Sequence, residues 1–428
     1  MKKILLWMSA ALVGLFSACQ SENDIDNNVE GDEETTPIVM NFSEKTDKDN
    51  AFTFDLFRIT YAHSKESNVF ISPLSISLAF NMVLNGSEGK TKADILEALR
   101  AKGYSVEDIN EYTQALCTDI ASPGYDELTE GIYTDLKIAN SIWAHNNWGK
   151  YPLKKEFIEI NQAYYDAEVN EIDFDAPDAL SRINGWCAEK TNYKIENVIE
   201  EISSASLLYI INAVYFKGHW FHPFMSELTG SEKFYPEDGG DKEVDMMKAT
   251  HYYEYFEDNL CQYLELSYRN RNFGMILMLP QQGKTTEDVI QHMDNDRWLS
   301  VKDGFEYKNV YLELPKFKFE CKYEMQKGIL QDMGMKAPFD SKIADFSGIS
   351  NMPQLFISKV IHNTFVEVNE EGTEAAAITV IEFPTGESGI EPPKPIDYIV
   401  NKPFLFGIRE KTTGAILFFG KVGDINGE

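Results

Sequence analysis

An unbroken globular pattern is the feature that most constrains how this chain can fold. From about Asp47 to Val422, apolar residues recur throughout, and no Pro/Gly/Ser-rich linker or internal repeat interrupts them. A chain of 428 residues, 43% of them hydrophobic, would by length alone suggest two or three domains. Because no boundary is visible, the sequence predicts one large domain over residues 47–424.

The order of the patterns within this stretch predicts the fold class. Helical spacing dominates the first half, at residues 54–61, 75–84 and 91–99, and Thr91 and Asp94 are placed for a capping box. Runs rich in Ile, Val, Phe and Tyr come later and predict strands at residues 207–216, 264–266, 275–279, 310–314 and 355–368. Helices followed by strands indicate an α+β fold.

The N-terminus has the composition of an export signal. Lys2 and Lys3 precede an apolar run too short to span a bilayer with certainty, and small residues lead to Cys19. Residues 15–19 (LFSAC) resemble the lipobox of bacterial lipoproteins, although Phe16 is an unusual occupant. That resemblance implies a signal peptide over residues 1–18 and acylation of Cys19. The alternative is a cleaved signal followed by an ordinary cysteine.

The segment after Cys19 is polar and acidic, which predicts a flexible tether over residues 19–46. Its early acidic residues resemble a surface-export signal of bacterial lipoproteins. We therefore expect an outer membrane lipoprotein of a Gram-negative bacterium, held by a lipid anchor through Cys19. It would face the cell surface or the periplasm.

The charge balance and the cysteines restrict the partners further. With 39 Lys and Arg against 69 Asp and Glu, the net charge of −30 argues against a nucleic-acid partner. Four later cysteines are widely separated and include no Cys-x-x-Cys pair, so we interpret them as buried apolar residues, with a single disulfide as the alternative. They are Cys117, Cys187, Cys261 and Cys321.

No arrangement of residues resembles an active site. The chain lacks the phosphate loop, the dinucleotide fingerprint, the zinc-protease motif and the nucleophile elbow, and residues 386–389 (GESG) lack the spacing of the last. The seven histidines are scattered, and His219 and His222 are interpreted as a chance pair around Trp220. We expect no enzyme activity, no metal and no cofactor.

Residues 373–381 are unusual for a surface loop. They contain Thr, Ala, Ile and Val with neither Gly nor Pro, so they can form a strand. One face would carry only small or apolar side chains, from Thr373 to Ile381, and could enter a sheet without burying a charge. From Phe383 the composition becomes that of a loop rich in Pro and Gly. The simpler interpretation is an edge strand followed by a long surface loop.

A family resemblance favours the interpretation of residues 373–381 as a strand that can enter a sheet. The octapeptide from Glu370 to Ala377, EEGTEAAA, is similar nearly residue for residue to the hinge of inhibitory serpins. Further motifs of that family occur in the same order along almost the whole chain beyond the tether. They lie at residues 68–76, 212–218, 244–247, 314–317, 345–348, 401–404 and 417–422.

The resemblance implies a serpin fold and a mechanism. The fold would have a large central sheet, two smaller sheets, about nine helices and an exposed reactive loop at about residues 370–395. A serine protease, or a papain-like cysteine protease, would attack the loop and form an acyl-enzyme. The cleaved loop would then enter the central sheet and distort the protease into a covalent complex. We expect a monomer that is kinetically held in its native form.

The resemblance also implies roles for individual residues. The hinge would comprise Glu370, Glu371, Gly372, Thr373, Glu374, Ala375, Ala376 and Ala377. Gly372 would be its flexing point, and Thr373 the first side chain to be buried. Trp220 would pack where the loop begins to insert. A polar cluster would control opening of the sheet, formed by Ser72, Ser75, Asn212 and His362.

The spacing of the family implies which bond is cut. Seventeen residues from Glu370 lead to Gly386, so the Gly386–Glu387 bond ranks first and Glu387–Ser388 second. The loop is longer than usual, which leaves the register open. No Lys or Arg lies between Glu374 and Pro393, and the small residues near Gly386 favour elastase-like proteases. The alternative function is a non-inhibitory carrier or chaperone, whose hinge would be expected to hold charges or prolines on the buried face.

Overall fold

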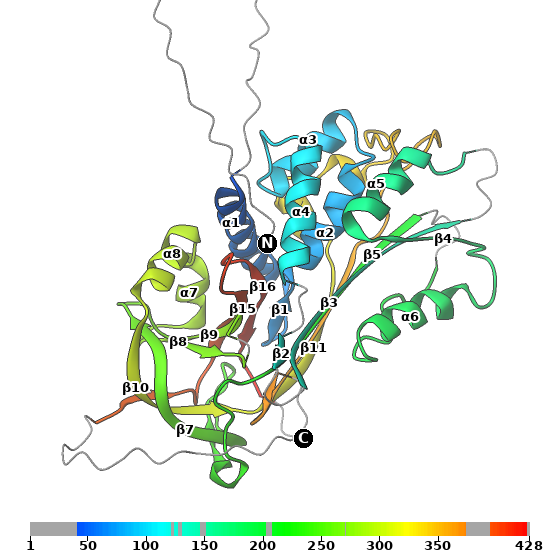
Figure 1. The fold of residues 1–428 in the computed structure, drawn as a ribbon. Coiled ribbons are helices and arrows are strands. Elements are labelled where there is room, and N and C mark those ends of the chain that lie inside the picture. Colours follow the sequence, from blue (N-terminus) through cyan, green and yellow to red (C-terminus); the bar gives the residue numbers. More distant parts are fainter. Residues whose placement is uncertain are drawn as a thin grey trace, which may run out of the picture. The chain divides into compact units, whose positions relative to one another are not determined.

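The computed structural model describes residues 41–120, 124–126, 131–145, 151–202, 208–269, 271–373 and 394–425. These residues contain two β-sheets and nine α-helices (Figure 1). The predicted signal peptide, Cys19 and most of the predicted tether lie outside them. The α+β class expected from the sequence is confirmed.

The nine helices of the described residues divide between the N-terminal half and the later part of the chain. They are α1 (Phe42–His63), α2 (Pro73–Leu84), α3 (Gly89–Ala98), α4 (Val106–Ile120), α5 (Lys155–Tyr165), α6 (Ala179–Lys190), α7 (Thr286–His292), α8 (Asn295–Gly304) and α9 (Ile329–Asp332). Two 3-10 turns are η2 (Ser226–Leu228) and η3 (Ala337–Phe339).

The central sheet has seven strands in the described residues, ordered β11-β12-β13-β5-β3-β2, with β4 beside β3. Its strands are β2 (Gly124–Asp126), β3 (Gly131–His145), β4 (Glu168–Ile172), β5 (Leu208–His219), β11 (Phe317–Glu324), β12 (Ile361–Val368) and β13 (Gly372–Thr373). The two-residue β13 is the only element that joins β12 to β5 within the described part of the chain. The sheet is therefore nearly divided in its middle.

The second sheet has nine strands in the described residues. They are β1 (Val69–Ile71), β6 (Gly230–Phe234), β7 (Lys242–Glu257), β8 (Cys261–Ser267), β9 (Phe273–Pro280), β10 (Glu306–Pro315), β14 (Ile396–Ile399), β15 (Phe404–Glu410) and β16 (Ile416–Val422). We expected two smaller sheets. The strands expected to form these two sheets are joined through β7, which pairs with β10 along its first part and with β8 at its end. They therefore form one continuous sheet.

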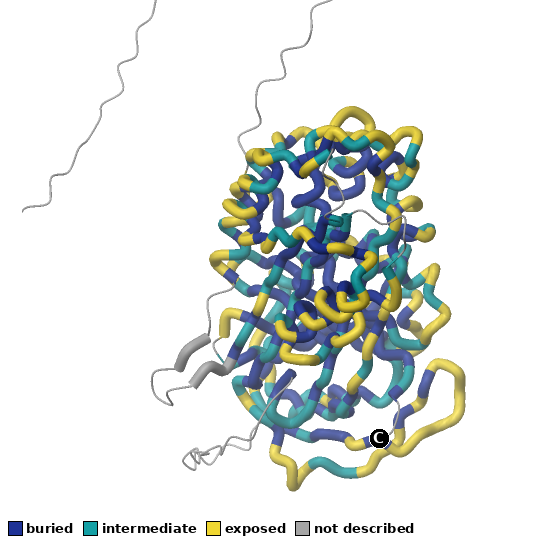
Figure 2. The backbone as a smooth tube through the Cα atoms, turned by 90° about the vertical axis from the view of Figure 1, so that its right-hand side faces the viewer, coloured by how far each residue is buried: buried dark blue, intermediate teal, exposed yellow. Residues whose placement is uncertain are grey.

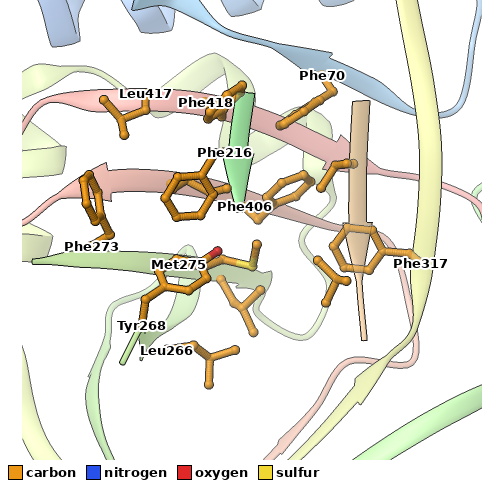
Figure 3. Close-up of a cluster of buried hydrophobic side chains, with 14 of the residues drawn as sticks. Phe70, Phe216, Leu266, Tyr268, Phe273, Met275, Phe317, Phe406, Leu417 and Phe418 are labelled. Carbon is orange, nitrogen blue, oxygen red and sulfur yellow. The ribbon is translucent and has the colours of Figure 1, made fainter. Parts of the chain in front are cut away.

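The core lies between the two sheets. Phe216 of β5 and Phe317 of β11 face Phe406 of β15 and Phe418 of β16 across the interior (Figure 3). On the other face of the central sheet, α6 packs its apolar side against β3 and β5. Buried residues gather in the interior of the body, and exposed residues lie mostly on its outer turns and ends (Figure 2). This packing holds β5 in place as a fixed edge beside the division in the sheet.

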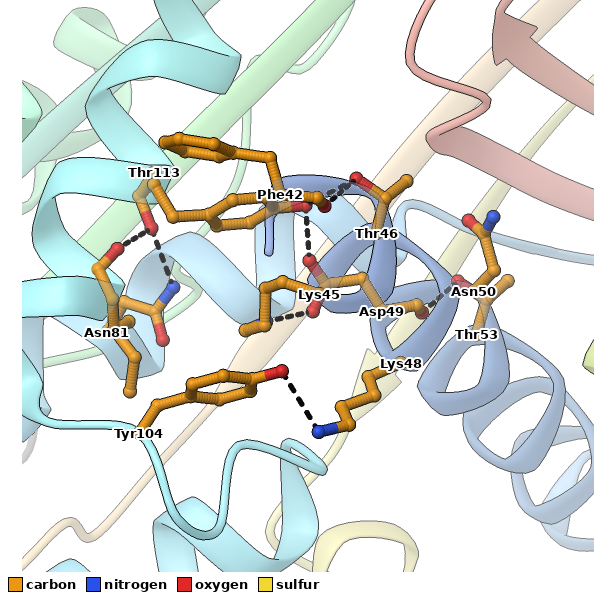
Figure 4. Close-up of polar contacts among 12 residues, drawn as sticks. Phe42, Lys45, Thr46, Lys48, Asp49, Asn50, Thr53, Asn81, Tyr104 and Thr113 are labelled. Atoms are coloured by element: carbon orange, nitrogen blue, oxygen red, sulfur yellow. Dashed lines mark hydrogen bonds and ion pairs between the residues drawn. The ribbon is translucent and has the colours of Figure 1, made fainter. Parts of the chain in front are cut away.

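The first helix is fastened to the body by polar contacts near its start. Asn50 donates to the Gly414 carbonyl at 3.0 Å and accepts from the Ile416 amide at 3.1 Å. The Lys48 ammonium donates to the Tyr104 hydroxyl at 2.9 Å. The two side chains are drawn in Figure 4. These contacts give the globular body a fixed beginning at α1.

Two local predictions were wrong. The helix expected at residue 91 begins at Gly89, so Thr91 and Asp94 form no capping box but face inward. They accept hydrogen bonds from the Asp345 and Ala337 amides. The strand expected from residue 355 begins at Ile361, because preceding amides bond elsewhere, such as Val360 to the Gln326 side chain at 2.8 Å.

One further prediction concerns the cysteines. Cys187, Cys261 and Cys321 are buried, Cys117 is partly buried, and none forms a disulfide in the described part of the chain. Within the residues that the structure describes, we find no helix with the length and apolar character needed to cross a bilayer.

Candidate functional site

A tight turn after β12 starts the hinge. The Asn369 amide donates to the Gly372 carbonyl at 3.0 Å, and the Asn369 side-chain oxygen accepts from the Glu371 and Gly372 amides at 3.1 and 3.3 Å. The chain reverses and places Thr373 opposite Val368 of β12 and Gly218 of β5. Gly372 and Thr373 of the predicted hinge are thus already part of the central sheet.

Gly372 lies where no side chain fits. A Cβ atom added there would be 2.0 Å from the Gly218 carbonyl oxygen and 2.8 Å from the His219 Cα. Both are backbone atoms, so any other residue would have to push the turn away from β5. The close approach explains a glycine at the expected flexing point.

Thr373 is buried, with 4% of its surface exposed, as expected for the first inserted side chain. Its hydroxyl lies 2.8 Å from the Tyr268 hydroxyl. The Tyr268 ring fits beside Gly218, where an added Cβ would be 2.5 Å from the ring. Our sequence analysis did not identify Tyr268, although strand alternation continued from Leu264 and Leu266 would have placed it inside.

Trp220 holds the other side of the turn. It is 1% exposed and stacks on Tyr268 with ring centroids 4.8 Å apart. Its indole N–H donates to the Asn369 carbonyl at 3.0 Å, and its amide donates to the Glu371 carbonyl at 2.8 Å. The structure therefore places Trp220 beside the hinge.

The two hinge glutamates have different environments. Glu370 accepts from the Thr229 hydroxyl at 2.9 Å and lies 3.5 Å from the Lys316 ammonium. One carboxylate oxygen of Glu371 is buried without a hydrogen-bond partner among the described residues. Burial, and then the charge of Glu370, raise the pKa of Glu371. The seated hinge thus contains one poorly compensated carboxylate next to one that is paired.

The pairing of the central sheet is interrupted between β5 and β12. In the described part of the chain, no ladder hydrogen bonds join β5 directly to β12. A cavity of about 80 Å³ lies there, lined by residues 208–212 from β5, by residues 355–357 and 359–362 leading into β12, and by α2 underneath. The segment wrongly predicted as strand forms one wall of this cavity.

Of the four residues expected to control sheet opening, Ser75, Asn212 and His362 line this cavity, and Ser72 is bonded to His362 beside it. The neutral His362 ring accepts from the Ser72 amide at 3.0 Å, and the Ser72 hydroxyl accepts from the Ser75 amide at 3.3 Å. Burial lowers the pKa of His362 to about 3. Asn212 lines the same cavity but donates to Asn140 of β3 at 2.7 Å. Three residues are therefore joined, and the fourth is held by the neighbouring strand.

Other predicted site residues lie outside the described residues. These are the later hinge positions Glu374, Ala375, Ala376 and Ala377, the proposed cut at Gly386, Glu387 and Ser388, and the lipidation site Cys19. Their roles remain predictions.

One group in the described residues has metal-binding side chains close together. His145, Asp173 and Asp175 offer atoms within 4.8 Å of one another. However, the Nδ1 atom of His145 already accepts from the Phe174 amide at 3.0 Å, and both carboxylates are exposed. The group has the features of a solvated surface turn.

Comparisons with known proteins agree on one family. The family model described as "Serpin (serine protease inhibitor)" matches residues 47–425. The leukocyte elastase inhibitor of Bos taurus is 35% identical over 385 residues, which cover 87% of this chain and 97% of that protein.

Solved structures show the same fold. The native thermophilic serpin tengpin has a TM-score of 0.79 at 27% identity, covering 91% of this chain and 96% of that one. Human thyroxine-binding globulin, solved with its hormone, has a TM-score of 0.79 at 24% identity, covering 90% and 100%.

Proposed function

The chain belongs to the serpin family, and we propose that it inhibits serine endopeptidases by inserting its cleaved reactive loop into the central sheet. Members of this family are generally protease inhibitors rather than enzymes. Some relatives, such as thyroxine-binding globulin, carry ligands instead, so the choice depends on features of this chain.

The observation that carries the proposal is the hinge seated between β5 and β12, two strands that are not paired directly with each other within the described residues. Gly372 and Thr373 already occupy the top of the gap between β5 and β12, and ladder hydrogen bonds between these strands are missing from the described residues below them. A chain that continues from Thr373 would meet two free strand edges. Strand addition at such edges is favourable because each new residue completes backbone hydrogen bonds.

Cleavage would release the chain needed for insertion. The protease hydroxyl would attack the Gly386 carbonyl carbon, the Gly386–Glu387 bond would break, and the Glu387 amine would leave with a proton. The product is an ester between the protease and Gly386. The fifteen residues from Gly372 to Gly386 span roughly 50 Å when extended, so insertion would carry the protease along the sheet.

We propose elastase-like proteases as the preferred targets, with papain-like cysteine proteases as a second class. The support is the small residues near Gly386 and the lack of Lys or Arg between Glu374 and Pro393. The relative from Bos taurus is named an elastase inhibitor, which agrees with this preference. The second candidate bond is Glu387–Ser388.

A carrier role has weaker support. Thyroxine-binding globulin is under 25% identical, so its similarity concerns the fold alone. The face of residues 373–381 that would be buried is small and apolar, and Thr373 is already in the sheet. Neither feature is needed by a carrier.

We also propose that the inhibitor acts while anchored through acylated Cys19, at the surface or in the periplasm of a Gram-negative cell. The support is the sequence of residues 1–37 alone. Labelling with radioactive palmitate should mark the protein but not a Cys19→Ala variant. Equal labelling of both would contradict the anchor.

The inhibitory function is tested by mixing the purified protein with an elastase-like serine protease and running a denaturing gel. We expect a covalent complex that survives boiling and a released fragment beginning at Glu387. Cleavage of the loop with full recovery of protease activity would overturn the proposal. A fragment beginning at Ser388 would support the same mechanism, with cleavage at the Glu387–Ser388 bond.

A further inference from the structure

A second hollow, of about 240 Å³, lies where β7 parts from β8. The two strands begin to pair at Glu254 and Glu265, and β10 pairs with the opposite edge of β7 up to Tyr255. The turn after β5 closes the opening, with the Phe221 amide donating to the Ser267 carbonyl at 2.9 Å. We call this space the fork hollow. β7 and β10 can be followed side by side in Figure 1.

The charged groups at its base neutralise one another. Glu265 is fully buried and pairs with Arg409 at 2.8 Å, while Lys411 lies 2.6 Å from Glu254 and 3.4 Å from Glu265. Gly274 leaves space for the Glu265 carboxylate, because an added Cβ would lie 1.9 Å from its oxygen. Two carboxylates thus face two cations, and the base of the fork hollow has no net charge.

The rim carries exposed aromatic side chains. Tyr252 is 60% exposed and Tyr307 is 69% exposed. Tyr307 lies opposite Glu254, and Tyr252 lies opposite Asn309, so the two tyrosines are diagonal neighbours on one face of the β7–β10 ladder. Such neighbours are about 7–8 Å apart. A planar ring between them would contact each at about 3.5 Å.

A cation with no ion-pair partner among the described residues lies at the same hollow. The Arg271 guanidinium stacks over the Phe221 ring, 4.0 Å from its centroid. It is exposed, and no carboxylate among the described residues lies within ion-pair distance. Arg271 and its neighbour His222 both line the fork hollow. The positive charge of Arg271 is therefore not balanced by the charged groups at the base of the fork hollow.

We propose that the fork hollow binds a small aromatic carboxylate. The ring would lie between Tyr252 and Tyr307, and the carboxylate would accept two hydrogen bonds from Arg271. The volume is below the 300–1,000 Å³ usual for drug-sized ligands, so it suits one or two rings. A neutral sugar would leave Arg271 unpaired, and an inorganic anion would leave the tyrosines unused. Trp220 lines the fork hollow and also holds the hinge turn, but ligand binding by the intact protein needs no protease, so it is tested separately from the proposed inhibition.

Calorimetry with 2-naphthoate tests the site on the intact protein. We expect saturable binding, at least tenfold weaker binding of the neutral 2-naphthamide, and no binding of inorganic phosphate. Arg271→Gln and Tyr307→Ala should each weaken naphthoate binding at least tenfold. Both side chains are exposed, so circular dichroism should show unchanged folding.

Matched controls are Arg182→Gln on α6 and Tyr193→Ala just after it, both at exposed positions. They should bind naphthoate like the unmodified protein. Equal affinity for naphthoate and naphthamide, or unchanged affinity in Arg271→Gln, would overturn the proposal. Phosphate binding as tight as that of naphthoate would also overturn it, because the rings would then contribute nothing.

Discussion

The Thr373 hydroxyl lies 2.8 Å from the Tyr268 hydroxyl, joining residues 105 positions apart in the sequence. Tyr268 follows β8 of the second sheet, and Thr373 belongs to the central sheet. The contact therefore fixes the start of the reactive segment to the core beneath it. Loss of this contact should loosen the hinge without changing the fold.

Tyr268→Phe should lower the free energy of unfolding by about 1–2 kcal/mol, because the Thr373 hydroxyl would stay buried without a partner. Urea unfolding measures the effect. Adding Thr373→Val should restore part of the loss, since both partners are then apolar. Tyr193→Phe, at an exposed tyrosine, should change nothing. A double variant less stable than Tyr268→Phe would contradict this account.

Gly372→Ala should displace the hinge turn from β5. Its Cβ would meet the Gly218 carbonyl at 2.0 Å, so the turn must move away from β5. We expect faster amide hydrogen exchange over residues 216–224 and a loss of about 2–4 kcal/mol in stability. Gly185→Ala is the control, because its added Cβ has open space in α6 and should stabilise the helix by about 0.5–1 kcal/mol. Unchanged exchange in Gly372→Ala would be evidence against a close-packed hinge.

Thr373→Arg should convert the inhibitor into a substrate. The new charge would have to enter a buried position, so insertion would become slower than release of the cleaved loop. The gel assay should then show cleaved protein in place of the covalent complex. Glu374→Lys changes the next residue, predicted to lie on the solvent face, and should still form the complex. Equal complex formation by Thr373→Arg would rule out burial as the controlling step.

Acid should lower the free energy of unfolding through His362. Burial lowers its pKa from 6.5 to about 3, so below pH 6.5 the unfolded chain binds a proton that the folded protein excludes. The free energy of unfolding should therefore fall by about 2–3 kcal/mol between pH 6.5 and pH 4.5. His362→Gln can still accept from the Ser72 amide and should lose that part of the pH dependence. Identical pH profiles for the two proteins would show that another group is responsible.

Several features could be predicted from the sequence because they depend on local patterns. The α+β class followed from the order of helical and strand-like runs, and the hinge octapeptide indicated the family. The boundaries were less reliable where side chains bond to distant residues. Thr91 and Asp94 match a capping box locally, but the amides they accept belong to Asp345 and Ala337. Their partners depend on how distant segments pack.

The sequence by itself determined that residues 373–381 can form a strand with one face free of charge, because side-chain alternation is a property of the backbone alone. Only the tertiary structure decided that Thr373 is seated between β12 and β5, which are not paired directly with each other within the described residues. That outcome depends on Tyr268, Trp220 and Gly218, which distant parts of the chain bring to one place. Contacts of this kind arise from packing between the sheets, which no local pattern encodes.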